Sequence, residues 1–135
     1  MTLEACAATA LAAAHGAGAI LRSRFRQPVE VETKADSSPV TAVDVASERR
    51  IRAIVSAAFP DHGIIGEEEG RIRENASHVW VIDPLDGTAS FLAGRPLFGV
   101  LLALVRDGQP VLGVLHQPLT QETWLGITGQ PTTLN

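Results

Sequence analysis

The stretch FGVLLALVRDGQPVLGVLHQP, residues 98–118, contains two apolar runs on either side of a turn. Val and Leu dominate both runs, as in buried strands, and the Asp-Gly pair between them is a hairpin signal. Similar runs stand on both sides of it, in HVWVID (residues 78–83) and ETWLGIT (residues 122–128). QPLTQ (residues 117–121) marks a second turn. These segments predict an antiparallel meander of four strands.

Two helices are expected before the meander. Apolar residues recur every three or four positions over residues 3–25, which is typical of one face of an amphipathic helix. A second helix is expected to end before Pro60. It begins at Thr41, because a hydroxyl residue followed three positions later by an acid, Asp44, matches a capping box.

Shorter segments complete the order of elements. VEVETK (residues 29–34) alternates as a half-buried strand does, and ADSSPV (residues 35–40) is expected to form a loop. Ile64 and Ile65 form a short apolar run that stops at GEEEG (residues 66–70). The order helix, strand, helix, strand, meander predicts an α+β fold, with a mostly antiparallel sheet and two helices on one face.

Composition narrows the class of protein. The chain has 135 residues, enough for one domain with a core. A net charge of −4 argues against a general nucleic-acid binder. The single cysteine, Cys6, excludes an internal disulfide and a cysteine-based zinc site. This favours a reducing, cytoplasmic setting, with Cys6 a core residue.

The N-terminal segment from Ala5 to Leu21 carries no charged residue. It is mostly alanine and glycine and follows Glu4, where a signal peptide would carry Lys or Arg. We expect it to be too short and too weakly apolar to span a membrane. The prediction is a soluble helix without a membrane partner.

Acidic residues cluster at the ends of expected elements. Asp44 stands in the first turn of the second helix, Glu67–Glu69 follow one strand, and Asp83 and Asp86 follow another. If neighbouring strands end together, these carboxylates converge at one edge of the sheet. Oxygen ligands without cysteines or paired histidines suit Mg²⁺.

The residues around the last two acids support this hypothesis. Pro84 interrupts the regular strand, which lets Asp83 and Asp86 bend around one point and aims the Leu85 carbonyl inward. Gly87 and Thr88 follow where a short helix could begin, and free N–H groups at such a start bind phosphate. The combination indicates metal-assisted phosphoryl transfer. Taken singly, the paired acids could be solvated loop residues, and Asp44 could be only a cap.

Three motifs together carry a family resemblance. IIGEEEG (residues 64–70), WVIDPLDGTASF (residues 80–91) and the upstream SPVTAVD (residues 38–44) resemble the inositol monophosphatase family in order and spacing. The resemblance covers about residues 3–135. It implies a magnesium-dependent, lithium-sensitive phosphatase and the N-terminal half of a layered α/β sandwich. The expected domain is a metal- and phosphate-binding unit over residues 1–135.

The resemblance also implies the metal ligands. Glu67 resembles a ligand that helps hold the attacking water, Asp83 an acid that bridges two metals, and Asp86 a ligand of the second. The backbone oxygen of Leu85 is expected at the first metal. Glu67, Leu85 and Asp86 are also expected to lie against the substrate phosphate. Two or three Mg²⁺ ions are implied.

Other implied roles concern phosphate, water and basic groups. Gly87 and Thr88 are expected to bind phosphate through backbone N–H groups. Thr88 and Asp44 resemble the hydroxyl–carboxylate pair that orients the nucleophilic water. Lys34 matches a basic position near the site, and a solvated lysine at a strand end is an equal alternative. Arg95 contacts substrate or braces its loop, and bracing is favoured.

The branch of the family is indicated by softer features. GRPLFG (residues 94–99) and QPTT (residues 130–133) resemble the histidinol-phosphatase branch, although His116 stands where that branch carries aspartate. This implies hydrolysis of histidinol phosphate to histidinol by metal-activated water, in histidine synthesis. Inositol 1-phosphate and other sugar or nucleotide phosphates are alternatives. The other three histidines are expected on a helix surface or in loops: His15, His62 and His78.

Family members are about twice this length. Their C-terminal half is expected to supply a further metal-binding aspartate and most of the substrate pocket. A non-catalytic module with an incomplete site is therefore a further alternative. The partners expected are a small phosphate monoester and a second chain. That chain would form a homodimer or associate through the surface that the C-terminal half would cover.

Overall fold

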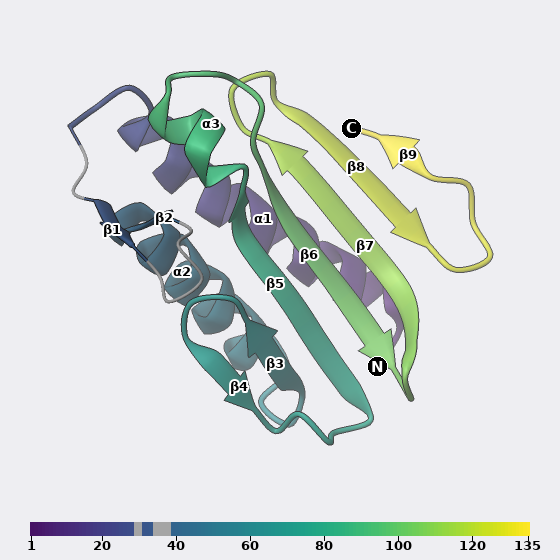
Figure 1. Ribbon diagram of the computed structural model, residues 1–135. Helices are drawn as coiled ribbons and strands as arrows, with labels where there is room; N and C mark the ends of the chain where they lie inside the picture. Colours follow the sequence, from purple (N-terminus) through teal and green to yellow (C-terminus); the bar gives the residue numbers. More distant parts are fainter. Residues whose placement is uncertain (29–30, 34–38) are drawn as a thin grey trace.

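A seven-stranded sheet with two long helices across one face forms the body of the chain (Figure 1). The computed structural model describes residues 1–28, 31–33 and 39–135. The helices are α1 (Leu3–Arg24) and α2 (Ala42–Ala58). The α+β class and the placement of both helices are as predicted.

The sheet has the strand order β4-β3-β5-β6-β7-β8-β9. The strands are β3 (Gly63–Gly66), β4 (Gly70–Ile72), β5 (His78–Asp86), β6 (Gly99–Arg106), β7 (Gln109–Gln117), β8 (Glu122–Ile127) and β9 (Thr133–Leu134). The pairs are antiparallel except for β3 and β5, which are parallel. The predicted hairpin joins β6 to β7 through Asp107 and Gly108, both with positive φ as a type I′ turn requires. The meander is therefore confirmed.

Several short elements differ from the prediction. β1 (Val31–Thr33) and β2 (Pro39–Thr41) pair with each other in a separate two-stranded sheet. The alternation of apolar and polar residues predicts a strand but not its partner. The strand expected within residues 29–34 is present as β1, but it does not belong to the main sheet. The loop expected over residues 35–40 is wrong at its last two residues, which belong to β2. The edge strands β4 and β9, three and two residues long, were not predicted.

β5 also runs further than expected. It continues through Pro84 to Asp86, and its pairing with β6 shifts register between Asp83 and Asp86. The proline therefore bends the strand rather than ending it, as expected for a residue that removes one ladder hydrogen bond.

The core lies between the helices and the sheet. Alanines of α1, among them Ala10, Ala13 and Ala17, are fully buried, which lets the helix approach closely. Trp80 of β5 and Leu104 of β6 are also fully buried, in the same core cluster. α1 has 22 residues and an 18-residue window with a mean hydropathy of 1.3, so by length and composition it could cross a membrane, contrary to our expectation. Its buried alanine face instead packs as a core helix does.

The other face of the sheet is not covered by any element in the described ranges (Figure 1). Val81, Leu115 and Trp124 are 39%, 41% and 42% exposed there. A shallow groove of about 500 Å³ runs across this face and reaches Asp83. An apolar sheet face of this kind normally packs against a further layer.

Candidate metal and phosphate site

The parallel pairing of β3 and β5 brings two of the predicted acids together. Its register aligns Gly66 with Ile82. Glu67, directly after β3, and Asp83, within β5, therefore lie side by side where the pairing of β3 with β5 stops. The two carboxyl groups interact, because the side chain of Glu67 raises the pKa of Asp83. The convergence expected from the sequence is found for this pair.

Asp83 lies in an environment that opposes its charge. Burial, the hydrogen bond and charge of Glu67, and the charge of Asp86 together raise the pKa of Asp83 to about 7. Its Oδ1 atom is buried and has no hydrogen-bond partner among the described residues. A buried oxygen without a donor is costly, and a bound cation would remove the cost of both the burial and the repulsion.

The third acid is held less closely. Asp86 is exposed and acts on Asp83 through its charge. Within the described ranges, no three His, Cys, Asp or Glu side chains form a group that could hold a metal ion. Like charges do not gather on their own. The chemistry of the Glu67–Asp83 pair thus fits a hard cation, as part of a ligand set rather than a whole one.

A second acid cluster stands beside the first. Asp44 is 1% exposed. Its Oδ2 accepts from the Thr41 N–H at 2.9 Å and from the Thr41 hydroxyl at 2.6 Å, which completes the predicted capping box. The Thr88 hydroxyl lies 3.1 Å from Asp44 Oδ1 and 3.2 Å from the Leu85 carbonyl oxygen. Asp44 is therefore a cap and also the partner of Thr88.

Gly87 forms the link between β5 and the short helix α3 (Thr88–Leu92). It is the N-cap of this helix with φ of 87°, in the left-handed region that glycine favours. A Cβ there would lie 2.6 Å from the Leu97 carbonyl oxygen. The short helix suggested by the sequence is present. Phosphate binding by the Gly87 and Thr88 amides stays a prediction.

Sequence reasoning missed Glu48, which is fully buried on α2. Its carboxylate accepts hydrogen bonds from the N–H groups of Glu68 and Glu69 and from Arg52. The turn that carries Glu67 is thus tied to α2. The available signal was spacing, because Asp44, Glu48 and Arg52 are four residues apart and so share one helix face.

Comparison with known proteins agrees with this geometry. Residues 2–135 match the inositol monophosphatase family. The chain belongs to that family. It is 43% identical over 135 residues to the chloroplastic bifunctional phosphatase IMPL2 of Arabidopsis thaliana, covering 98% of this chain and 39% of the relative. The histidinol-phosphatase of Chlorobaculum parvum is 39% identical over 127 residues, or 93% of this chain and 49% of the relative.

Solved structures of the family share the fold. An inositol monophosphatase from Zymomonas mobilis is 44% identical with a TM-score of 0.84. The match covers 100% of this chain and 52% of the Zymomonas chain. The extragenic suppressor protein suhB from Bartonella henselae is 32% identical with a TM-score of 0.90. The match covers 94% of this chain and 50% of the suhB chain. The chain therefore spans about half the length of these family members.

The basic residues that the family resemblance suggested add little to the site. Lys34 lies outside the described residues. The Arg95 side chain is exposed and makes no hydrogen bond or ion pair to a residue of the described ranges, so the bracing contact is not seen. Only its backbone N–H bonds within the loop, to the Ser90 carbonyl oxygen at 2.8 Å.

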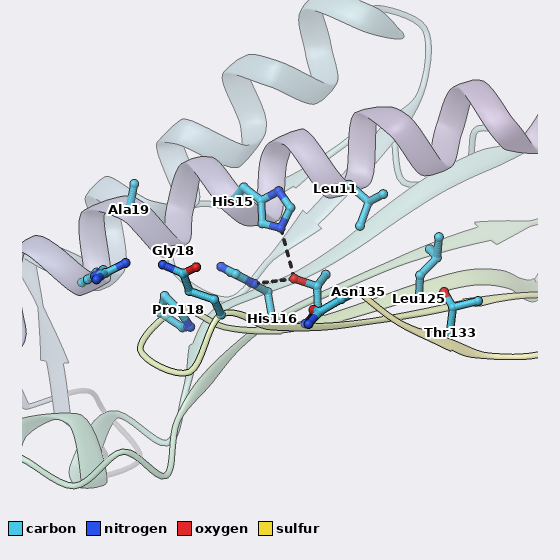
Figure 2. A pocket seen from close by; sticks show the side chains of 12 residues that line it. Leu11, His15, Gly18, Ala19, His116, Pro118, Leu125, Thr133 and Asn135 are labelled. Atoms are coloured by element: carbon cyan, nitrogen blue, oxygen red, sulfur yellow. Dashed lines mark hydrogen bonds between the residues drawn. The ribbon is translucent and has the colours of Figure 1, made fainter.

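All four histidines have hydrogen-bond or ring contacts, and His78 stacks on His62 with ring centroids 4.8 Å apart. His62 is buried, contrary to expectation for an ordinary loop residue, and accepts from the Trp80 indole N–H at 3.0 Å. His15 and buried His116 both contact the Thr123 hydroxyl, at 3.1 and 2.8 Å, in a pocket of about 710 Å³ between α1 and strands β7 and β8 (Figure 2). Burial and the charge of His15 lower the pKa of His116. Burial likewise lowers that of His62.

Proposed function

We propose that this chain carries the metal- and phosphate-binding half of a Mg²⁺-dependent phosphatase that hydrolyses a small phosphate monoester. The observation that carries the proposal is the meeting of Glu67 and Asp83 at one sheet edge, with Asp83 Oδ1 buried and lacking a donor. Beside this pair stands the Asp44–Thr88 contact. The domain assignment to residues 1–135 belongs to the same proposal.

Glu67, Asp83 and Asp86, with the Leu85 carbonyl oxygen, would hold the metal ions. Bound Mg²⁺ would supply positive charge to neutralise the phosphate and lower the pKa of a water molecule. The family resemblance adds two or three ions and inhibition by Li⁺ to the proposal. The chain's own contribution is a fixed set of oxygens in a partly buried setting, where charge interactions are stronger than in bulk water.

Thr88 and Asp44 orient the attacking water. When the Thr88 hydroxyl donates its hydrogen bond to Asp44 Oδ1, its oxygen lone pairs are free to accept a hydrogen bond from water. Asp44 is itself fixed by the capping box, so the Thr88 hydroxyl is held in direction. The backbone N–H groups of Gly87 and Thr88 face the phosphate and position it for in-line attack.

Histidinol phosphate is the substrate we favour, with conversion to histidinol in histidine synthesis and a cytoplasmic setting. Residues 94–99 and 130–133 support it, as do relatives whose names state this activity. The test is a comparison of kcat/KM for histidinol phosphate and inositol 1-phosphate in Mg²⁺. A higher value for inositol 1-phosphate would move the chain to the other branch without altering the chemistry.

The exposed apolar sheet face is proposed to bind a second polypeptide. Val81, Leu115 and Trp124 supply the surface, and the relatives are about twice as long as this chain. The occupant is a second copy or a chain that supplies the remaining half. Residues 1–135 are expected to self-associate in light scattering and to hydrolyse substrate weakly. A monodisperse monomer with turnover typical of full-length relatives would contradict both expectations.

Removal of one carboxylate tests the chemistry. Asp83→Asn keeps the side-chain shape and should lower phosphate release by roughly a hundredfold or more, since a charge that the metals need is lost. Asp107→Asn is the matched control, because Asp107 is exposed in the β6–β7 turn with φ of 50°, a conformation that asparagine tolerates. Near-normal release by Asp83→Asn in saturating Mg²⁺ would contradict the proposed role.

A further inference from the structure

Glu48 is a charged side chain that the core completely encloses. Its exposed fraction is 0%, and it lies on α2 one turn after Asp44. Buried carboxylates are kept only where several donors satisfy them. The groups that donate to the Glu48 carboxylate therefore explain why it can be buried.

The donors come from one side of the molecule. Glu48 Oε2 accepts from the Glu68 N–H at 2.6 Å, and Oε1 from the Glu69 N–H at 3.0 Å. Arg52 Nε donates to Oε1 at 2.8 Å, and Arg52 Nη2 donates to the Gly70 carbonyl oxygen. The two α2 side chains thus bind the backbone of three consecutive residues that follow Glu67.

The residue before Glu67 is also in contact with Glu48. A Cβ on Gly66 would meet Glu48 Oε1 at 1.9 Å and Arg52 Nη2 at 2.5 Å. Glycine is required there because the carboxylate packs directly against the backbone. Glu67 is therefore fixed from both sides by one buried group, while its own side chain extends toward Asp83.

We propose that Glu48, supported by Arg52, is a positioning residue that fixes the direction of Glu67 toward Asp83 and so sets the affinity for Mg²⁺. This inference rests on the proposed function for the role of Glu67, but not for the contact itself. Groups that orient ligands from behind typically contribute tenfold to a hundredfold in metal affinity.

Glu48→Gln tests the inference, because the amide keeps the shape but replaces one acceptor with a donor that faces an N–H group. Amide hydrogen exchange at Glu68 and Glu69 should rise about tenfold or more. The dissociation constant for Mg²⁺, measured by calorimetry on the same 135-residue chain, should rise by a similar factor.

Glu69→Gln is the matched control. It removes an equal charge from the same turn, but the one ion pair of the Glu69 side chain within the described part of the chain is with the exposed Arg49, at 2.6 Å. Both measurements should change less than about twofold, as expected for a surface pair. An equal loss of Mg²⁺ affinity in both variants would assign the effect to charge alone and overturn the positioning role.

Gly66→Ala tests the same contact with every ionisable group retained, in case Glu48→Gln does not fold. It should also weaken Mg²⁺ binding. Faster exchange with unchanged affinity would overturn the positioning role, and unchanged exchange would overturn the contact. If the parent chain binds no Mg²⁺, the proposed function fails together with the role in affinity. The exchange measurement then still reports whether Glu48 holds the turn.

Discussion

The acidic residues of α2 and the acidic residues at the end of the β3–β5 pairing have opposite surroundings. On α2, Asp44 and Glu48 are almost fully buried, and their carboxylate oxygens accept several hydrogen bonds from backbone and side-chain donors. At the end of the β3–β5 pairing, Asp83 faces another acid and has one buried oxygen to which none of the described residues donates.

The difference separates acids that stabilise the fold from an acid whose surroundings suit a bound cation. An acid satisfied by donors stabilises the folded chain, so its removal costs stability. An acid raised in pKa by burial and a like charge destabilises the folded chain when ionised, so its removal relieves a penalty. Substitutions should therefore have opposite signs in the two clusters.

The largest effect is expected at Asp44. Asp44→Ala leaves the Thr41 N–H and the Thr41 hydroxyl without their acceptor, and it removes one of the two acceptors of the Thr88 hydroxyl. The free energy of unfolding should fall by about 2–4 kcal/mol, because hydrogen bonds to a charged group and the cap are lost together. Urea denaturation measures it. A loss under about 0.5 kcal/mol would place Asp44 with ordinary surface acids.

Asp83→Asn should shift stability in the other direction. The pKa of Asp83 is raised to about 7, so its contribution is fully present below the ordinary value near 3.8 and is lost as pH rises through about 7. Without divalent cations, the variant should match the parent at pH 4. At pH 8 it should exceed the parent by about 1–2 kcal/mol, allowing for solvent screening. Equal stability at both pH values would contradict the raised pKa.

Addition of Mg²⁺ sharpens the same contrast. A cation that binds the folded chain alone stabilises it by about 1 kcal/mol at roughly five times its dissociation constant. The gain should be larger at pH 8 than at pH 6, because Asp83 must lose its proton first. Thermal unfolding with and without Mg²⁺ measures the gain, and Asp83→Asn should largely lose it. A gain independent of pH would indicate binding elsewhere.

The smallest effect concerns the buried histidines, which lie away from both clusters. The pKa values of His62 and His116 are lowered, mainly by burial. Their contribution is present above the ordinary pKa near 6.5 and is lost as pH falls below it. Stability should fall by about 0.5–1 kcal/mol between pH 7 and pH 5, and His116→Asn should reduce that slope. Asp107→Asn, in the exposed β6–β7 turn, is the control.

Local signals in the sequence predicted the satisfied cluster well. The Thr41–Asp44 capping box and the Asp107-Gly108 turn depend on contacts within four residues, so residue type and spacing suffice. The parallel pairing of β3 with β5 was not predicted, because the partner of a short strand depends on packing over the whole sheet. For the same reason the separate β1–β2 pair and the role of Glu48 were missed.

The candidate site was predicted in part for a similar reason. Motif order indicated Glu67, Asp83 and the Asp44–Thr88 pair, and the structure brings each of these pairs together. Asp86 does not close a group of three within the described residues. The bulge between Asp83 and Asp86 depends on the pairing with β6, which composition does not specify.

The parallel register of β3 with β5 has a consequence for engineering the chain. β4 and the connecting residues 73–77 lie between the two strands in the sequence. The length of that connection does not determine how β3 and β5 are aligned. Insertions there, such as a short affinity tag, should leave the paired acids in place. A single residue added within β5 before Asp83 would instead reverse the alternation of every side chain that follows. Asp83 would then turn toward the helices.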